Sequence, residues 1–217
     1  MVFVAGIIGS ELAPTKSLST LPVATIVVGT ALSVIPVIRM MSIFGRKKVF
    51  LSACIYSILL IGLCIFSITK EIFFLFSFAS FCLGASVATM MQFRFAAIES
   101  VNPEQRASAT AVVLLGGLIS AFLGTEIATI GKSLLNTDFV GSFLLLAFLF
   151  IIAFLFMTFF EPAAKFKEHK EKSKRPLIDI IMQGSFIVAV SAATTGYVVM
   201  SFIMTATPVS MHVMDGH

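Results

Sequence analysis

The chain has 217 residues, of which 58% are hydrophobic and 12% charged, and its mean hydropathy is +1.05. A soluble domain carries about a quarter charged residues, so this chain has too few polar side chains to cover a water-soluble globule. The composition excludes a soluble protein and predicts an integral membrane protein.

A membrane-crossing helix needs roughly 20 mostly apolar residues, and six such segments follow a short apolar stub at Met1–Gly9. The apolar runs are continuous rather than alternating, which favours helices over barrel strands. The predicted fold class is therefore all-α, a polytopic transmembrane helix bundle with a truncated first span. The six full spans are expected at Leu18–Met41, Val49–Thr69, Ile72–Ile98, Pro103–Gly131, Val140–Phe160 and about Leu177–Thr207.

The basic residues indicate how the bundle is oriented. Most of the 15 Lys and Arg residues fall in alternate connections, whereas the other connections hold Lys16, Lys70 and Lys132. By the positive-inside rule, the basic connections are cytoplasmic. This predicts a multi-pass protein of the cell (inner) membrane with a cytoplasmic N-terminus, and it explains the net charge of +4 without a nucleic-acid partner. The cytoplasmic basic residues would be Arg39, Arg46, Lys47, Lys48, Arg94, Arg106, Lys165, Lys167, Lys170, Lys172, Lys174 and Arg175.

Two connections have a local signature. Asn102-Pro103-Glu104-Gln105 has the residues of a helix start, with Asn at the N-cap and Pro at the first helical position. Glu161–Arg175 is rich in charge and has no apolar face, which is typical of a solvated linker. We therefore expect three parts: an N-terminal helical bundle at 1–160, a charged cytoplasmic linker at 161–176, and span seven, the start of a second bundle, at 177–217.

The spans differ in polarity. Val140–Phe160 is apolar on every side and is expected to face lipid. The fourth, fifth and seventh spans contain charged, polar and small residues, and a charge at membrane depth costs roughly 2.5–3.5 kcal/mol. These three spans are therefore expected to face the protein interior or a water-filled cavity. Their polar and small residues are Gln92, Arg94, Gly116, Gly117, Gly124, Glu126, Gly196 and Tyr197.

Three motifs in this order resemble the major facilitator superfamily. Gly45-Arg46-Lys47-Lys48 is similar to the end of its cytoplasmic loop motif, although Ser42 replaces the acidic residue. The Gly-rich fifth span resembles the antiporter motif, with Thr125 in place of Pro. The third motif is the pair Gln92–Ala97 and Tyr197–Pro208, which resembles a bacterial branch of the superfamily.

The resemblance implies that the first, fourth and seventh spans line a central cavity and that the third and sixth face lipid. It also implies that the chain is the N-terminal half plus the seventh helix of a longer transporter. The chain would then have two partners, the missing C-terminal bundle of the same protein and the lipid bilayer. Gly45, Arg46, Lys47 and Lys48 form the cytoplasmic loop motif, in which Arg46, Lys47 and Lys48 would set the topology first and act as a conformational switch second.

Arg94 is the strongest candidate for a cavity residue. It lies five residues before Glu99, so about 7–8 Å inside the end of the span. It is either a cation that binds an anionic substrate or gates the cytoplasmic side, or a side chain that snorkels to the interface. Gln92 is a weaker candidate, because it does not share the face of Arg94 closely.

The fifth and seventh spans supply further candidates. Glu126 lies roughly 8–9 Å inside its span. A carboxyl group in apolar surroundings retains its proton, which suits proton coupling; alternatively, Glu126 reaches water at the extracellular end. Tyr197, Met200 and Met204 share one helical face, as either substrate contacts or packing residues.

The sequence predicts no enzyme, no cofactor and no metal. It contains no nucleotide-binding loop, no Gly-x-Ser-x-Gly and no His-x-x-x-His. The three cysteines fall inside apolar runs, and His212, Asp215 and His217 do not make a metal set.

The predicted function is secondary active transport of a small, unidentified solute across the cell membrane by alternating access, coupled to an ion gradient. A non-transporting accessory or assembly subunit is the alternative, and a membrane-embedded enzyme is a third hypothesis.

Overall fold

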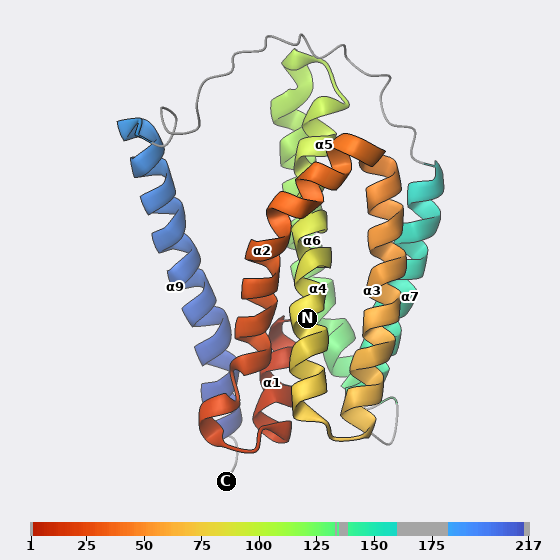
Figure 1. The fold of residues 1–217 in the computed structure, drawn as a ribbon, viewed down its shortest axis with the longest axis vertical. Helices are drawn as coiled ribbons and strands as arrows, with labels where there is room; N and C mark the ends of the chain where they lie inside the picture. The colour runs from red at the N-terminus through yellow and green to blue at the C-terminus, as the bar shows by residue number, and fades with distance from the viewer. Residues whose placement is uncertain (1, 133, 135–138, 160–181, 215–217) are drawn as a thin grey trace.

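The computed structural model describes residues 2–132, 134, 139–159 and 182–214, and within these ranges the chain is helical without strands (Figure 1). The predicted all-α fold is confirmed. In chain order the helices are α1 Val2–Leu12, α2 Leu21–Phe44, α3 Arg46–Thr69, α4 Phe73–Met90, α5 Phe93–Glu99, α6 Arg106–Lys132, α7 Val140–Phe159 and α9 Gly184–Met214. Two 3₁₀ turns, Lys16–Leu18 and Pro103–Gln105, precede α2 and α6.

Six helical stretches in the described ranges are long and apolar enough to cross a membrane, as predicted. They match the expected spans with shifts of a few residues at their ends. The expected helix start at Asn102 is also present, but the first turn after it is a 3₁₀ turn. The Asn102 side chain makes no capping hydrogen bond. The linker at 161–176 lies outside the described residues.

The centre of the bundle is the crossing of α2 and α4. Gly29 and Gly84 bring the two backbones together, since a Cβ atom at Gly84 would lie 2.7 Å from the Ile26 carbonyl oxygen. Thr25 Oγ1 also donates a hydrogen bond to the Ser77 carbonyl oxygen, at 3.1 Å. In lipid there is little hydrophobic drive between helices, so close packing and interhelical hydrogen bonds hold such a crossing together.

α3 and α7 complete the packed side of the bundle. The buried hydroxyl groups of Ser57 on α3 and Ser86 on α4 are hydrogen-bonded at 2.7 Å. Phe76 on α4 meets Phe143 on α7 edge to face, with ring centroids 6.2 Å apart. The opposite faces of α3 and α7 are exposed and apolar, for example at Leu59 and Phe156.

The sequence analysis expected one continuous helix at Ile72–Ile98 for the fourth span. The structure has two helices there. The span is divided into α4 and α5 by a turn at Met91–Gln92, where the Gln92 amide donates to the Thr89 carbonyl oxygen three residues back, at 3.0 Å. The two parts have different neighbours, because α4 packs against α2 and α3 whereas α5 packs against α6. Hydropathy does not reveal a single interrupted turn, which is why the sequence did not predict it.

α6 and α9 are exposed along most of their described length. A Cβ atom added at Gly116, Gly117, Gly124 or Gly196 would meet nothing within 4 Å. The close helix approach expected at these glycines is therefore absent from the part of the chain that the structure describes. α9 runs beside α1, and α6 meets α5 and α7 (Figure 1).

Candidate functional site

The structure gathers basic side chains at one end of the bundle. The α2–α3 connection, α5, the start of α6 and the last turn of α7 lie together at the top of Figure 1. We call this the basic end; its described basic residues are Arg39, Arg46, Lys47, Lys48, Arg94 and Arg106. Lys70 lies at the opposite end, in the turn between α3 and α4.

Gly45 makes the sharp connection between α2 and α3. Its φ of +85° is a conformation that side-chain-bearing residues rarely adopt. Its amide donates to the Met41 carbonyl oxygen at 3.0 Å, which closes the last turn of α2. The chain therefore reverses within one residue and places Arg46, Lys47 and Lys48 in the first turn of α3.

Arg46 forms an ion pair across the basic end. Its Nη2 atom donates to Glu99 Oε1, at the last residue of α5, over 2.5 Å. The two side chains are 30% and 61% exposed, so solvent weakens the attraction between their charges. The other terminal nitrogen, Nη1, is buried without a hydrogen-bond partner among the described residues. The pair thus links α3 to α5 without a large net stabilisation.

Lys47 links α3 to α7. Its Nζ atom donates to the Thr158 carbonyl oxygen at 2.7 Å, next to the last residue of α7. The carbonyl groups of a last helical turn have no partner within the helix, and a cation there also complements the helix dipole. Arg46 and Lys47 thus connect α3 to two different helices at the same end.

A ring stack adds to the contact between α3 and α5. Phe50 and Phe93 lie with their centroids 4.3 Å apart and their planes at 23°. Phe50 is fully buried in a small apolar cluster with Val37, Met41 and Ala96. The basic end therefore has an apolar layer beneath its charged layer.

Arg94 lies on α5 with an exposed side chain. Its guanidinium carbon is 5.0 Å from the centroid of the neighbouring Phe95 ring, a cation–π distance. Gln92 is half-buried in the turn before α5. The roles predicted for Arg94 and Gln92 in a cavity remain predictions.

The other candidate residues lie on separate helices. Glu126 is exposed on α6, towards the opposite end. Tyr197 and Met200 are exposed on α9, and the side chain of Met204 lies outside the described part. The structure does not bring Arg94, Glu126 and Tyr197 together, and their predicted roles also stay predictions.

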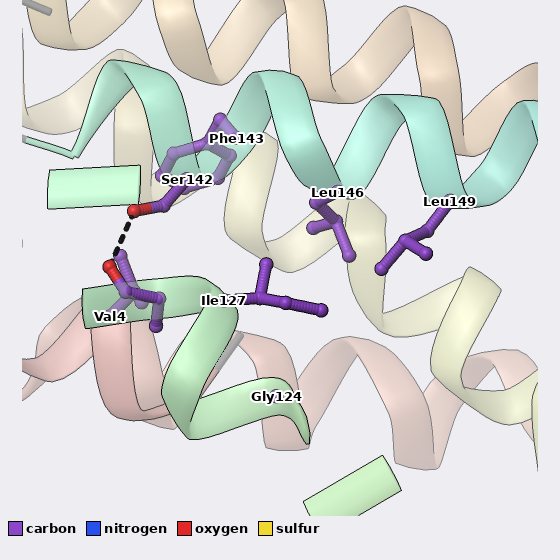
Figure 2. A pocket seen from close by; sticks show the side chains of 8 residues that line it. Val4, Gly124, Ile127, Ser142, Phe143, Leu146 and Leu149 are labelled. Carbon is purple, nitrogen blue, oxygen red and sulfur yellow. Dashed lines mark hydrogen bonds between the residues drawn. The ribbon is translucent and has the colours of Figure 1, made fainter. Parts of the chain in front are cut away.

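Two small apolar cavities occur elsewhere in the described bundle. One of about 90 Å³ lies between α1, α6 and α7, where Ser142 Oγ donates to the Ala128 carbonyl oxygen at 2.8 Å (Figure 2). The other, of about 130 Å³, lies between α2, α4 and α7, and it is lined by Ile26, Leu83, Ser86, Val87, Met90 and Phe150. Gly124 lines the first cavity, whereas Arg94, Glu126 and Tyr197 line neither.

Comparison with known proteins identifies the family. The profile of the Major Facilitator Superfamily matches residues 1–215, nearly the whole chain. The chain belongs to the Major Facilitator Superfamily. It is therefore part of a membrane transporter family, and the resemblance predicted from its motifs is confirmed.

A curated member of this superfamily is similar to the chain. The riboflavin transporter RfnT of Brucella anthropi is 31% identical over 225 aligned residues, which cover 100% of this chain and 55% of that protein. The chain thus spans about half the length of the curated relative it matches. No solved structure gives a significant match.

The sequence analysis missed the partners of the superfamily loop motif. Glu99 and Arg46 fall at the same end of the predicted topology, so the parity of the spans was a signal for their pairing. The hydrogen bond from Lys47 to the Thr158 carbonyl oxygen could not be predicted from the sequence, because every residue has a carbonyl group. Although Ser42 replaces the acidic residue of the loop motif, Arg46 finds a carboxylate on α5.

Proposed function

We propose that this chain forms one half of a secondary active transporter, which moves a small solute across the cell membrane by alternating access. The observation that carries the proposal is the set of contacts made by the Gly45–Lys48 loop with α5 and α7. An exposed ion pair and a lysine–carbonyl bond can open at modest cost, which suits the end of a bundle that must change its packing. Alternating access requires two bundles around a midplane site, and the length of RfnT leaves room for a second one.

The orientation of the bundle follows from its charges. The positive-inside rule assigns the basic end to the cytoplasm. The N-terminus would then start on the cytoplasmic side, as the sequence analysis expects, and the α3–α4 turn with Lys70 would be extracellular. Arg46 and Lys47 would accordingly close the cytoplasmic side.

Riboflavin is the first substrate to test, because the curated relative transports it. A flavin has a planar ring and a polyol chain. Arg94 offers a guanidinium group and Tyr197 an aromatic face to such a molecule, and both side chains are exposed. Glu126 is the candidate that would couple solute movement to protons.

Uptake of labelled riboflavin tests this proposal. The complete protein that contains the chain is produced in cells unable to synthesise riboflavin, with and without a protonophore. We expect accumulation above that of the empty vector, which the protonophore abolishes. Accumulation that persists with the protonophore contradicts proton coupling, and no uptake of any flavin or other metabolite in a panel contradicts transport.

Neutralising either charge of the Arg46–Glu99 pair tests whether the Gly45–Lys48 motif acts as a conformational switch. Arg46→Gln or Glu99→Gln removes one partner of the pair, and an exposed pair contributes about 1 kcal/mol or less. A change of about 1 kcal/mol alters a conformational equilibrium about fivefold, so each variant should change the uptake rate by up to about fivefold.

The double variant separates coupling from independent effects. If the two side chains act as a pair, Arg46→Gln with Glu99→Gln changes uptake no more than either single variant. The exchange Arg46→Glu with Glu99→Arg should restore most of the rate. Additive losses, measured at equal protein levels, contradict the pairing.

A further inference from the structure

The larger of the two apolar cavities lies between α2, α4 and α7, and its volume is about 130 Å³. Three of its lining residues are buried and three are half-buried, so the cavity has a closed side and a side that a small molecule can reach. The buried residues are Ile26, Leu83 and Ser86, and the half-buried ones are Val87, Met90 and Phe150. The cavity is therefore separate from the residues predicted to contact the transported solute.

The lining favours an apolar ligand. The one polar side chain among the six lining residues is Ser86, whose hydroxyl group is already hydrogen-bonded to that of Ser57 at 2.7 Å. A water molecule in a cavity needs about two to four polar partners, and these six side chains do not supply them. A charged or strongly polar ligand would lose its hydration without compensation. The cavity is thus suited to a hydrocarbon.

Contacts outside the cavity fix the positions of the three helices around it. The backbone contact between Gly29 and Gly84 sets the distance between α2 and α4. The edge-to-face contact between Phe76 and Phe143 does the same for α4 and α7. The atoms that line a cavity lose dispersion contacts, and this loss persists where the surroundings cannot relax. A ligand of matching size would restore the contacts and stabilise the bundle.

The size and the lining indicate the class of ligand. An apolar cavity of about 150 Å³ lined by Leu, Ile and Phe takes up benzene or xenon, and the present cavity is similar in volume and lining. Phe150 offers an aromatic ring for an edge-to-face contact, and Met90 offers a thioether group, which packs well against aromatic rings. These two side chains favour an aromatic ligand over an alkyl chain.

We propose that the cavity between α2, α4 and α7 is a binding site for a single-ring aromatic hydrocarbon of about the size of benzene. The ligand reaches the cavity past the half-buried side chains of Met90 and Phe150 and packs against Ile26 and Leu83. The site is distinct from that of the transported solute, so the inference does not depend on what the protein carries.

Thermal unfolding in the presence of benzene tests the site. The complete protein that contains the chain is placed in lipid nanodiscs, and its Tm is measured with and without benzene. A ligand that binds only the folded state raises Tm, and we expect a rise of about 2–4 °C near saturation. Val87→Phe places a ring of the protein itself in the cavity, so this variant should no longer respond to benzene.

Val112→Phe is the matched control, because Val112 is exposed on α6 and lies outside the cavity lining. This variant should respond to benzene as the wild type does. Where Val87→Phe does not fold, Val87→Met fills part of the cavity with a flexible side chain and should weaken the response.

Three outcomes overturn the proposal. The first is that benzene does not raise the Tm of the wild type, and the second is that it raises the Tm of Val87→Phe equally. The third is a response in detergent that disappears in lipid nanodiscs, which would assign the cavity to a lipid acyl chain.

Discussion

Replacing Gly84 by valine is expected to separate α2 from α4 and to cause the largest loss of stability in this protein. The added Cβ would lie 2.6 Å from the Gly29 carbonyl carbon and 2.7 Å from the Ile26 carbonyl oxygen. These are backbone atoms of α2, which cannot rotate away as a side chain can. Overpacking costs about 1–3 kcal/mol or more, and each kcal/mol shifts Tm by about 2–4 °C at this chain length. We therefore expect Tm to fall by up to roughly 10 °C in a fluorescence-detected melt.

Gly62→Val is the matched control for this prediction. Gly62 lies inside α3, where an added Cβ would meet nothing within 4 Å. The same chemical change should leave the melting curve close to that of the wild type. If the Gly84→Val and Gly62→Val proteins have the same Tm, α2 and α4 do not cross at Gly84.

The arrangement of the spans could be predicted because it depends on composition over long segments. A run such as Val140–Phe159 is apolar throughout, so the bilayer alone requires it to be a spanning helix. The grouping of Arg46, Lys47, Arg94 and Arg106 at one end follows from the alternation of the connections. Neither property depends on how one helix is rotated against another.

The contacts at the basic end depend on that rotation and could not be predicted. Glu99 and Arg46 were placed at the same end, yet their pairing requires the first turn of α3 to face the last turn of α5. The stack of Phe50 on Phe93 has the same requirement, and 23 phenylalanines offer many alternative pairs. Periodicity indicates a polar face only where polar residues are frequent, and these helices contain few.

The crossing of α2 and α4 shows a second limit. The sequence analysis drew attention to Gly116, Gly117 and Gly124 on α6, whereas the described close contact between helix centres uses Gly29 and Gly84. A glycine permits close approach in either case. Which glycine is used depends on the partner surface, which a sequence motif on one helix does not describe.

Arg94→Ala is expected to reduce uptake to the level of the empty vector while the protein still inserts in the membrane. Arg94 is exposed, and among the described residues its contact is with the Phe95 ring beside it. Its removal leaves no buried carboxylate without a partner, so the fold should be retained. Uptake measured at equal membrane protein levels, with the elution profile in detergent as the check on folding, tests this expectation.

Arg106→Ala is the control that decides between the two interpretations of Arg94. Arg106 is also an exposed cation at the basic end, at the first turn of α6, so both variants reduce the positive charge of that surface equally. If Arg94 contacts the solute, its variant loses uptake, Arg94→Lys keeps part of it, and Arg106→Ala keeps nearly all. Normal uptake by Arg94→Ala would instead assign its side chain to snorkelling at the membrane interface. Equal losses in both alanine variants would attribute the effect to the charge of the basic end rather than to a contact made by Arg94.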